Sequence, residues 1–241
     1  MKTVTTPNGR FYTPDGTDLK LPSVTTILGS MSDKSGIDDW IKKVGKKEAN
    51  RISTNAANRG TFMHLLCENY LRKKYEEKLP EENMLKDTFI ETMDDKEVKD
   101  FSREQLISGK NLFMNMHRDG VFNTIDDVVI QEVALWSING GGYAGRVDLI
   151  AKMINGNLVV IDFKSSGKPK KREWIENYFL QASAYAFAYY ERHNIMPQTA
   201  EIWISNEQNE VPQIFKLNLD ELKEYYTKFI SYVKGYHAKI K

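Results

Sequence analysis

Apolar residues are spaced differently in the two halves of the chain. In the first half they recur every three or four positions, which is typical of helices with one buried face. Such stretches lie at 37–55, 60–75 and 102–118. A short extended segment precedes them, with a turn at 14–16, and Ser23 after Pro22 is placed to cap the first helix. The first half is therefore predicted to be mainly helical.

The second half carries strand signals, which begin near Val128 with a run of β-branched and apolar residues. Two further apolar runs flank Asn155 and Gly156, a pair that favours a tight hairpin turn. Later segments are predicted as a helix at 173–192, strands at 200–204 and 213–217, and a final helix capped by Asp220. The order of helices, three strands, helix, two strands and helix predicts an α/β (α+β) fold with helices covering a central sheet.

Length and composition suit one compact domain overall, made of a helical region at 1–120 and a sheet-containing core at 121–241. No apolar stretch is long enough to span a bilayer, and the N-terminus has no signal-like apolar core. We therefore expect a cytoplasmic protein with no membrane partner. Cys67 is the only cysteine, which excludes a cysteine-bound iron–sulfur cluster or a disulfide within one chain.

The charged residues are unevenly distributed. The formal net charge is only +1, so overall charge does not indicate a nucleic acid partner. Residues 76–100 are rich in acids, whereas 42–51 and 168–172 are rich in lysine and arginine. Each basic segment is either an ordinary solvated face or a surface that guides a phosphate backbone, and the sequence leaves both interpretations open.

The chemically informative residues lie in the predicted hairpin. Each of its strands has one carboxylate where the apolar run is interrupted, Asp148 in the first and Asp162 in the second, and Lys164 follows two residues later. Alternation along a strand puts Asp162 and Lys164 on one face. One interpretation is an ion pair at the sheet end between Lys164 and either acid. The other is a divalent cation held by both carboxylates, which would polarise a phosphodiester while Lys164 stabilises charge on the phosphoryl oxygens.

Five motifs accompany one another in order along the chain. They are Pro22-Ser23-Val24-Thr25, Gly60-Thr61-Phe62-Met63-His64 with Glu68, Glu132 followed by Gly145-Arg146-Val147-Asp148, Ile161-Asp162-Phe163-Lys164, and Gln181-Ala182-Ser183-Ala184-Tyr185. In order and spacing the chain resembles the PD-(D/E)XK nuclease superfamily and, within it, the RecB-type exonucleases. Small phage exonucleases and the mitochondrial genome maintenance exonuclease belong to the branch that is most similar in layout. The resemblance runs from Pro22 to about Tyr190, most of the chain.

The resemblance implies a restriction-endonuclease-like core with a mixed sheet, and an N-terminal helical layer that contributes to the site. It implies Mg²⁺ or Mn²⁺ as cofactor, with four ligands and a catalytic lysine, Lys164. The implied metal ligands are His64, Asp148, Asp162 and the main-chain carbonyl of Phe163. For His64, the alternative from the residues alone is a core histidine in an apolar helix.

Three further positions have implied roles near the metal. Glu132 would organise the site or bind a second metal, although a surface ion pair is the alternative. Gln181 and Tyr185, four apart on one helix face, would contact nucleic acid or hold the lysine, whereas an exposed amide and a packed tyrosine are the alternatives. Glu68 is either an acceptor for the ring N–H of His64 or an ordinary exposed glutamate.

The expected function is therefore that of a metal-dependent exodeoxyribonuclease, a hydrolase that acts on single-stranded DNA or DNA ends in replication, recombination or repair. A bacterial or phage-infected cell is the expected setting. The alternatives are a structure-specific endonuclease of the same fold and a catalytically inactive DNA-binding or recombination accessory protein. The full set of motifs favours an enzyme. Because the chain has no phosphate-binding loop of a motor, a helicase or recombinase partner would be a separate chain.

Overall fold

The computed structural model describes residues 1–33 and 35–240 and shows a mixed α/β protein. The elements of its first half are β1 (Lys2–Thr6), β2 (Gly9–Thr13), β3 (Leu21–Pro22), α1 (Val24–Met31), α2 (Ser35–Val44), α3 (Lys46–Leu71), η1 (Arg72–Glu77), α4 (Glu81–Met93), α5 (Arg103–Asp119) and η2 (Val121–Thr124). Those of the second half are β4 (Ile125–Ser137), η3 (Asn139–Gly141), β5 (Tyr143–Met153), β6 (Leu158–Ser166), η4 (Arg172–Trp174), α6 (Glu176–His193), β7 (Thr199–Asn206), β8 (Gln213–Leu217) and α7 (Leu219–Lys239). The predicted α/β class and order of elements after residue 120 are confirmed.

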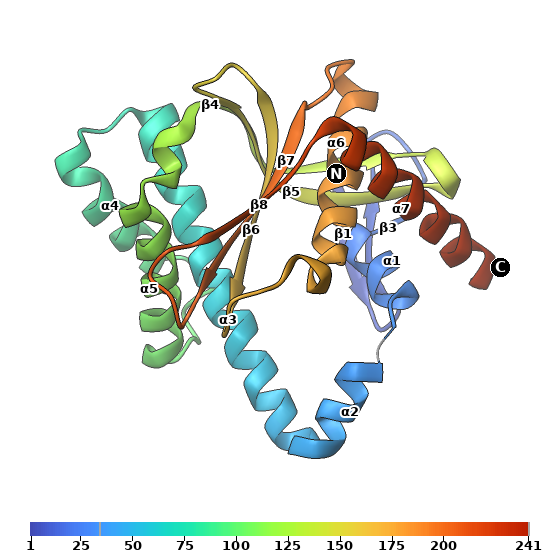
Figure 1. Cartoon of the computed structure of the whole chain (residues 1–241), viewed down its shortest axis with the longest axis horizontal. Helices are drawn as coiled ribbons and strands as arrows, with labels where there is room; N and C mark the ends of the chain where they lie inside the picture. Colours follow the sequence, from blue (N-terminus) through green and yellow to red (C-terminus); the bar gives the residue numbers. More distant parts are fainter. Residues whose placement is uncertain (34, 241) are drawn as a thin grey trace.

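A five-stranded sheet in the order β4-β5-β6-β7-β8 lies at the centre of the molecule (Figure 1). Neighbouring strands are antiparallel except β6 and β7, which are parallel and joined through α6. The sheet is therefore mixed, as the resemblance implies. The predicted hairpin turn between β5 and β6 is also present, and Gly156 in it has a φ of +85°, which the absence of a Cβ permits.

Two helical layers cover the two faces of this sheet (Figure 1). On one face, Leu149, Ile161 and Trp203 pack in a core with residues of α3 and α5. On the other face, Ile150 and Val160 pack in a second core with residues of α1, α6 and α7. Successive strand residues point to opposite faces, so each central strand contributes to both cores. A site where the pairing of β5 with β6 stops, at Asp148 and Asp162, can therefore receive side chains from α3 and from α6.

A second, three-stranded sheet in the order β1-β2-β3 occupies the N-terminal segment, where only an extended start was predicted. An isolated parallel bridge between Ser23 and Ala144 joins it to the start of β5. Tyr12 and Leu21 pack with Ala144 in a small buried cluster. The sheet is thus fixed beside the start of β5, close to the predicted site.

The helix predicted over 37–55 is wrong, because the chain forms two helices that meet at Gly45. Gly45 has a φ of +87°, a conformation that breaks an α-helix and favours glycine. After it, α3 continues without interruption through the expected gap before residue 60.

The acid-rich segment 76–100 also contains an unexpected helix, α4. Its buried face holds Met84, Thr88 and Thr92, which is too weak an apolar pattern to stand out in the sequence.

Helix caps decide the remaining boundaries. Ser23 caps α1 as predicted, since its hydroxyl accepts a hydrogen bond from the Thr26 amide at 2.9 Å. The prediction that Asp220 caps the last helix is wrong: the Asn218 side chain accepts from the amides of Asp220 and Glu221, and Glu221 returns a bond to the Asn218 amide. Within the described residues, no helix is both long and apolar enough to cross a membrane.

Candidate active site

Three carboxylates lie in one row across neighbouring strands of the central sheet, Glu132 of β4, Asp148 of β5 and Asp162 of β6. In the β4–β5 register, the residues on both sides of Glu132 pair with those on both sides of Asp148. The last regular β5–β6 pair, Leu149 with Ile161, is followed directly by Asp148 and Asp162. Residues opposite one another in a sheet have their Cβ atoms about 5 Å apart. Strand pairing therefore brings together three acids that lie far apart in the sequence.

The regular backbone pairing is disturbed at this row. Glu132 has a φ of +52°, in the left-handed region that a glutamate rarely adopts. The amide of Phe163, next to Asp162, donates to Asp148 Oδ2 at 2.8 Å, so a side chain takes the place at which a strand partner's carbonyl would accept. Unusual backbone conformations that persist in a folded protein cluster at functional sites.

Asp162 and Lys164 point to the same side of β6, as alternation predicts, and form an ion pair. The Asp162 side chain is 1% exposed, and its Oδ1 atom has no hydrogen-bond partner among the described residues. A buried carboxylate oxygen without a partner is costly in a protein interior. The ion pair of the first interpretation is therefore present, but it leaves one oxygen of Asp162 unsatisfied, and a bound cation would satisfy it.

His64 reaches the row from α3, on the opposite side from α6. Its Nδ1 atom lies 3.6 Å from Asp148 Oδ2, and one potential ligand atom each from His64, Glu132 and Asp148 lie within 4.8 Å of one another. The close approach of α3 depends on Gly60, where a Cβ would come within 2.9 Å of Ser165 Oγ. One imidazole and several carboxylates form a donor set that suits a divalent cation. The residues present therefore fit a metal.

Burial and mutual repulsion shift the pKa values of these groups in a consistent way. Burial, with the nearby Asp148, raises the pKa of Glu132 to about 8, and burial raises the pKa of Asp162 to about 6 and that of Asp148 as well. Burial and the Lys164 charge lower the pKa of His64 to about 4. Burial alone would lower the pKa of Lys164, but Asp162 and Asp148 raise it. At neutral pH the site thus holds a neutral imidazole, a charged lysine and crowded acids whose repulsion a cation would relieve.

Glu132 and Asp148 of this row open into a cleft of about 660 Å³. The predicted site residues that line it are His64, Glu132, Asp148, Lys164, Gln181 and Tyr185. Asp162 and Phe163 are buried and do not line it. Gln181 and Tyr185 project from α6, and Gly145 leaves room for the tyrosine, because a Cβ there would lie 2.7 Å from Tyr185 Oη.

Several cleft residues had no predicted role. Arg146 lies within the Gly-Arg-Val-Asp motif and pairs with Glu132, at 2.6 Å between Nε and Oε2. Arg10 and Tyr12 come from β2, and nothing in their local sequence indicates a site. Glu68 lines the cleft but makes no hydrogen bond to His64 among the described residues, so its predicted contact with the ring is not seen.

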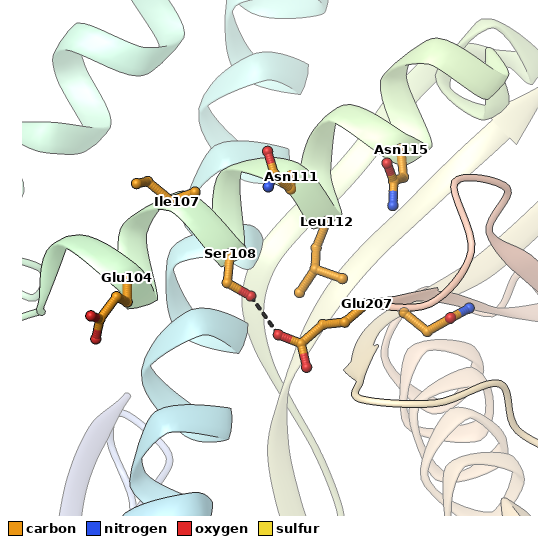
Figure 2. Close-up of a pocket in the computed structure, with 8 residues that line it drawn as sticks. Glu104, Ile107, Ser108, Asn111, Leu112, Asn115 and Glu207 are labelled. Carbon is orange, nitrogen blue, oxygen red and sulfur yellow. Dashed lines mark hydrogen bonds between the residues drawn. The ribbon is translucent and has the colours of Figure 1, made fainter.

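A second, smaller hollow of about 360 Å³ lies between α5 and the end of β7 (Figure 2). Ser108 Oγ donates to Glu207 Oε1 at 2.8 Å across it (Figure 2). The described residues that line it include Glu104 and Glu207 but no basic side chain, and none of the predicted site residues. Its described lining therefore offers no basic side chain to an anionic substrate, and the predicted site residues lie in the larger cleft.

Comparison with known proteins gives the same family as the motifs. The family model of the PD-(D/E)XK nuclease superfamily matches residues 41–239. No curated protein matches. Among solved structures, one from Eubacterium rectale described as a candidate exonuclease is similar, with 14% identity, a TM-score of 0.41 and coverage of 72% of this chain and 68% of that one. The protein SSO0001 is similar with 18% identity, a TM-score of 0.34 and coverage of 71% and 73%.

Proposed function

The chain belongs to the PD-(D/E)XK nuclease superfamily, and from this premise we propose that it is a metal-dependent exodeoxyribonuclease acting on single-stranded DNA or on DNA ends. Replication, recombination or repair of DNA is the proposed setting. One observation carries the proposal: the row of Glu132, Asp148 and Asp162, with Lys164 beside it and His64 above it. A protein that only bound DNA would have no need for buried, mutually repelling acids at the bottom of a cleft.

His64, Asp148, Asp162 and the main-chain carbonyl of Phe163 would hold Mg²⁺ or Mn²⁺, and Glu132 lies close enough to join them. When bound, such an ion polarises a phosphodiester and lowers the pKa of a coordinated water. The partnerless Oδ1 of Asp162 supports this assignment, because a cation would satisfy it. The low pKa of His64 supports it too, since only a neutral imidazole can bind a metal.

The chain's own residues would supply the rest of the chemistry. Lys164 keeps its positive charge because Asp162 and Asp148 raise its pKa, so it can orient water or stabilise charge on the phosphoryl oxygens. Gln181 and Tyr185 would contact the nucleic acid or hold the lysine from α6. The basic segments at 42–51 and 168–172 would guide the backbone from outside the cleft, because no basic side chain of either segment lines it. A helicase or recombinase would act from a separate chain.

The test of catalysis is cleavage of an end-labelled oligonucleotide in Mg²⁺, Mn²⁺ or EDTA. We expect cleavage with either metal and none in EDTA. Asp162→Ala and Lys164→Ala should each lower the rate about 100-fold or more, because the first removes a proposed metal ligand and the second removes the positive charge beside the reacting phosphate. Asp127→Ala, an exposed acid of β4 outside the cleft, is the matched control and should keep the wild-type rate. Undiminished cleavage by both site variants would contradict the proposal.

Linear and circular single-stranded DNA distinguish the type of nuclease. An exonuclease needs an end and leaves the circle intact. Cleavage of the circle at a rate similar to that of the linear strand would instead show an endonuclease. Measured on the same enzyme preparation, this comparison separates the mode of cleavage from the question of whether the site is catalytic.

A further inference from the structure

The N-terminal sheet forms one wall of the cleft although it lies outside the part of the chain that matches the family model, 41–239. β2 and the segment around the start of α1 contribute Arg10, Tyr12, Ser23 and Thr25 to the lining. The family match therefore accounts for the acids and the lysine but not for this wall. Arg10 and Tyr12 lie before both the matched range and the Pro22-Ser23-Val24-Thr25 motif, so a substrate contact made by either is a feature of this chain.

The backbone at Arg10 is held firmly in place. Its amide donates to Thr26 Oγ1 at 2.9 Å, and its carbonyl accepts from the Ser23 amide at 2.8 Å. Gly9 lies against the Thr26 side chain and leaves no room for a Cβ. These bonds all use main-chain atoms of Arg10, so the guanidinium itself has no part in the fold of the sheet.

Arg10 differs from the other basic side chains of the cleft. Lys164 is paired with Asp162, and Arg146 with Glu132. Arg10 is exposed, and the described residues give its side chain neither a hydrogen bond nor an ion pair. Most other charged residues along the cleft are acids, which repel a phosphate backbone. An unpaired guanidinium is the group on this surface best able to attract one.

We propose that Arg10 binds a backbone phosphate of the nucleic acid strand and so positions that strand against the row of acids. This inference rests on the proposed function, because it names how the substrate of that same cleft is held. The flat, forked guanidinium donates two parallel hydrogen bonds to a phosphate, and its rigid strand fixes the distance from the row. Arg10 is thus a substrate-binding residue supplied by the N-terminal sheet.

The test is binding of a fluorescein-labelled single-stranded oligo(dT) of 20 nucleotides, measured by anisotropy in EDTA over a series of salt concentrations. We expect Arg10→Ala to raise Kd about tenfold at low salt and to reduce the slope of log K against log salt by about 0.7, the value for one phosphate contact on a single strand. Arg10→Lys should keep most of the slope, because it keeps the charge, but recover only part of the affinity. The control is Lys2→Ala, an exposed cation of the same sheet that does not line the cleft, and it should match wild type.

Cleavage kinetics in Mg²⁺ give a second measure. Arg10→Ala should raise KM about tenfold and leave kcat within about twofold of wild type, with an unchanged circular dichroism spectrum and melting temperature. The inference would be overturned if Arg10→Ala had the same Kd and salt slope as the control Lys2→Ala. It would also be overturned if Arg10→Ala lowered kcat and left KM unchanged. If wild type binds the oligonucleotide through Arg10 but never cleaves it, the proposed function fails and the inference stands. If wild type neither binds nor cleaves it, both fail.

Discussion

Gly145 leaves the space that Tyr185 occupies in the candidate active-site cleft. Tyr185 is nearly buried, and burial raises the pKa of its hydroxyl well above the ordinary value, so it stays protonated and can donate a hydrogen bond. Its ring and hydroxyl occupy the space that a side chain at position 145 would fill. A residue without a side chain is thus needed three positions before Asp148.

Gly145→Ala should displace Tyr185, because the new Cβ would lie 2.7 Å from both Oη and Cε1. We expect a loss of about 1–3 kcal/mol in the free energy of unfolding, as for other overpacked sites, together with slower cleavage. Urea denaturation and the end-labelled cleavage assay measure the two effects. Gly29→Ala in α1 is the control, since a Cβ there meets nothing within 4 Å and should be neutral or stabilising. Equal stability of the two variants would contradict the role given to Gly145.

At the scale of elements, α1 links the N-terminal sheet to the central sheet. Its cap, Ser23, is 3% exposed, lines the cleft and bridges to Ala144 at the start of β5. Its backbone amide also holds Arg10. The cap of α5, Ser102, forms a capping box with Gln105 but lies away from the cleft. These two caps are therefore chemically similar and differ in what they position.

Ser23→Ala and Ser102→Ala should each lower the free energy of unfolding by about 1 kcal/mol, because each leaves a helix N-terminus with one fewer acceptor. Only Ser23→Ala should also slow cleavage, by a few-fold, since α1 and the N-terminal sheet form part of the cleft. Urea denaturation and cleavage rates, taken on both variants, provide the comparison. A similar drop in activity for Ser102→Ala would show that activity simply follows stability.

At the scale of the whole molecule, the metal-free site makes stability depend on pH. In the fold, Glu132 has a pKa of about 8 against an ordinary 4.5, so it favours folding below pH 4.5 and loses that contribution as pH rises through 8. His64 acts in the opposite sense, since its pKa falls from 6.5 to about 4, but only below pH 6.5. Asp162, with a pKa of about 6, stabilises the fold only at lower pH and has lost most of that stabilisation at pH 6.5. Between about pH 6.5 and 8, Glu132 dominates.

We therefore expect the metal-free protein to lose stability as pH rises from about 6.5 to 8 in EDTA, measured by urea denaturation. Glu132→Gln should flatten this dependence, because it cannot ionise, whereas the exposed Glu210→Gln should leave it unchanged. Adding Mg²⁺ or Mn²⁺ at about pH 8 should raise the melting temperature of wild type, because ligands that bind only the folded state stabilise it. A free energy of unfolding that rose with pH between about 6.5 and 8 would contradict the raised pKa of Glu132 in the folded protein.

Local patterns in the sequence predicted the central sheet and part of the site. The hairpin with Asp148, Asp162 and Lys164 was visible because apolar runs, an Asn-Gly turn and strand alternation are properties of neighbouring residues. The break at Gly45 and the helix α4 were missed, because one glycine seldom ends a helix by itself and because threonines line much of the buried face of α4. The break at Gly45 can be recognised only from the backbone angle, and α4 can be recognised only from the residues against which it packs.

The sequence by itself determined which strand residues are polar in an apolar context, and hence which acids and which lysine could do chemistry. Only the tertiary structure decided that Glu132 shares a row with Asp148, since strand register is a contact between segments far apart along the chain. The same holds for Arg10, which lies more than a hundred residues before the acids and has no distinctive local pattern. The periodicity of apolar residues indicates which side of a helix or strand is buried, and it depends only on residues that are close in the sequence. The formation of a site depends on which distant surfaces meet, and that is settled by packing.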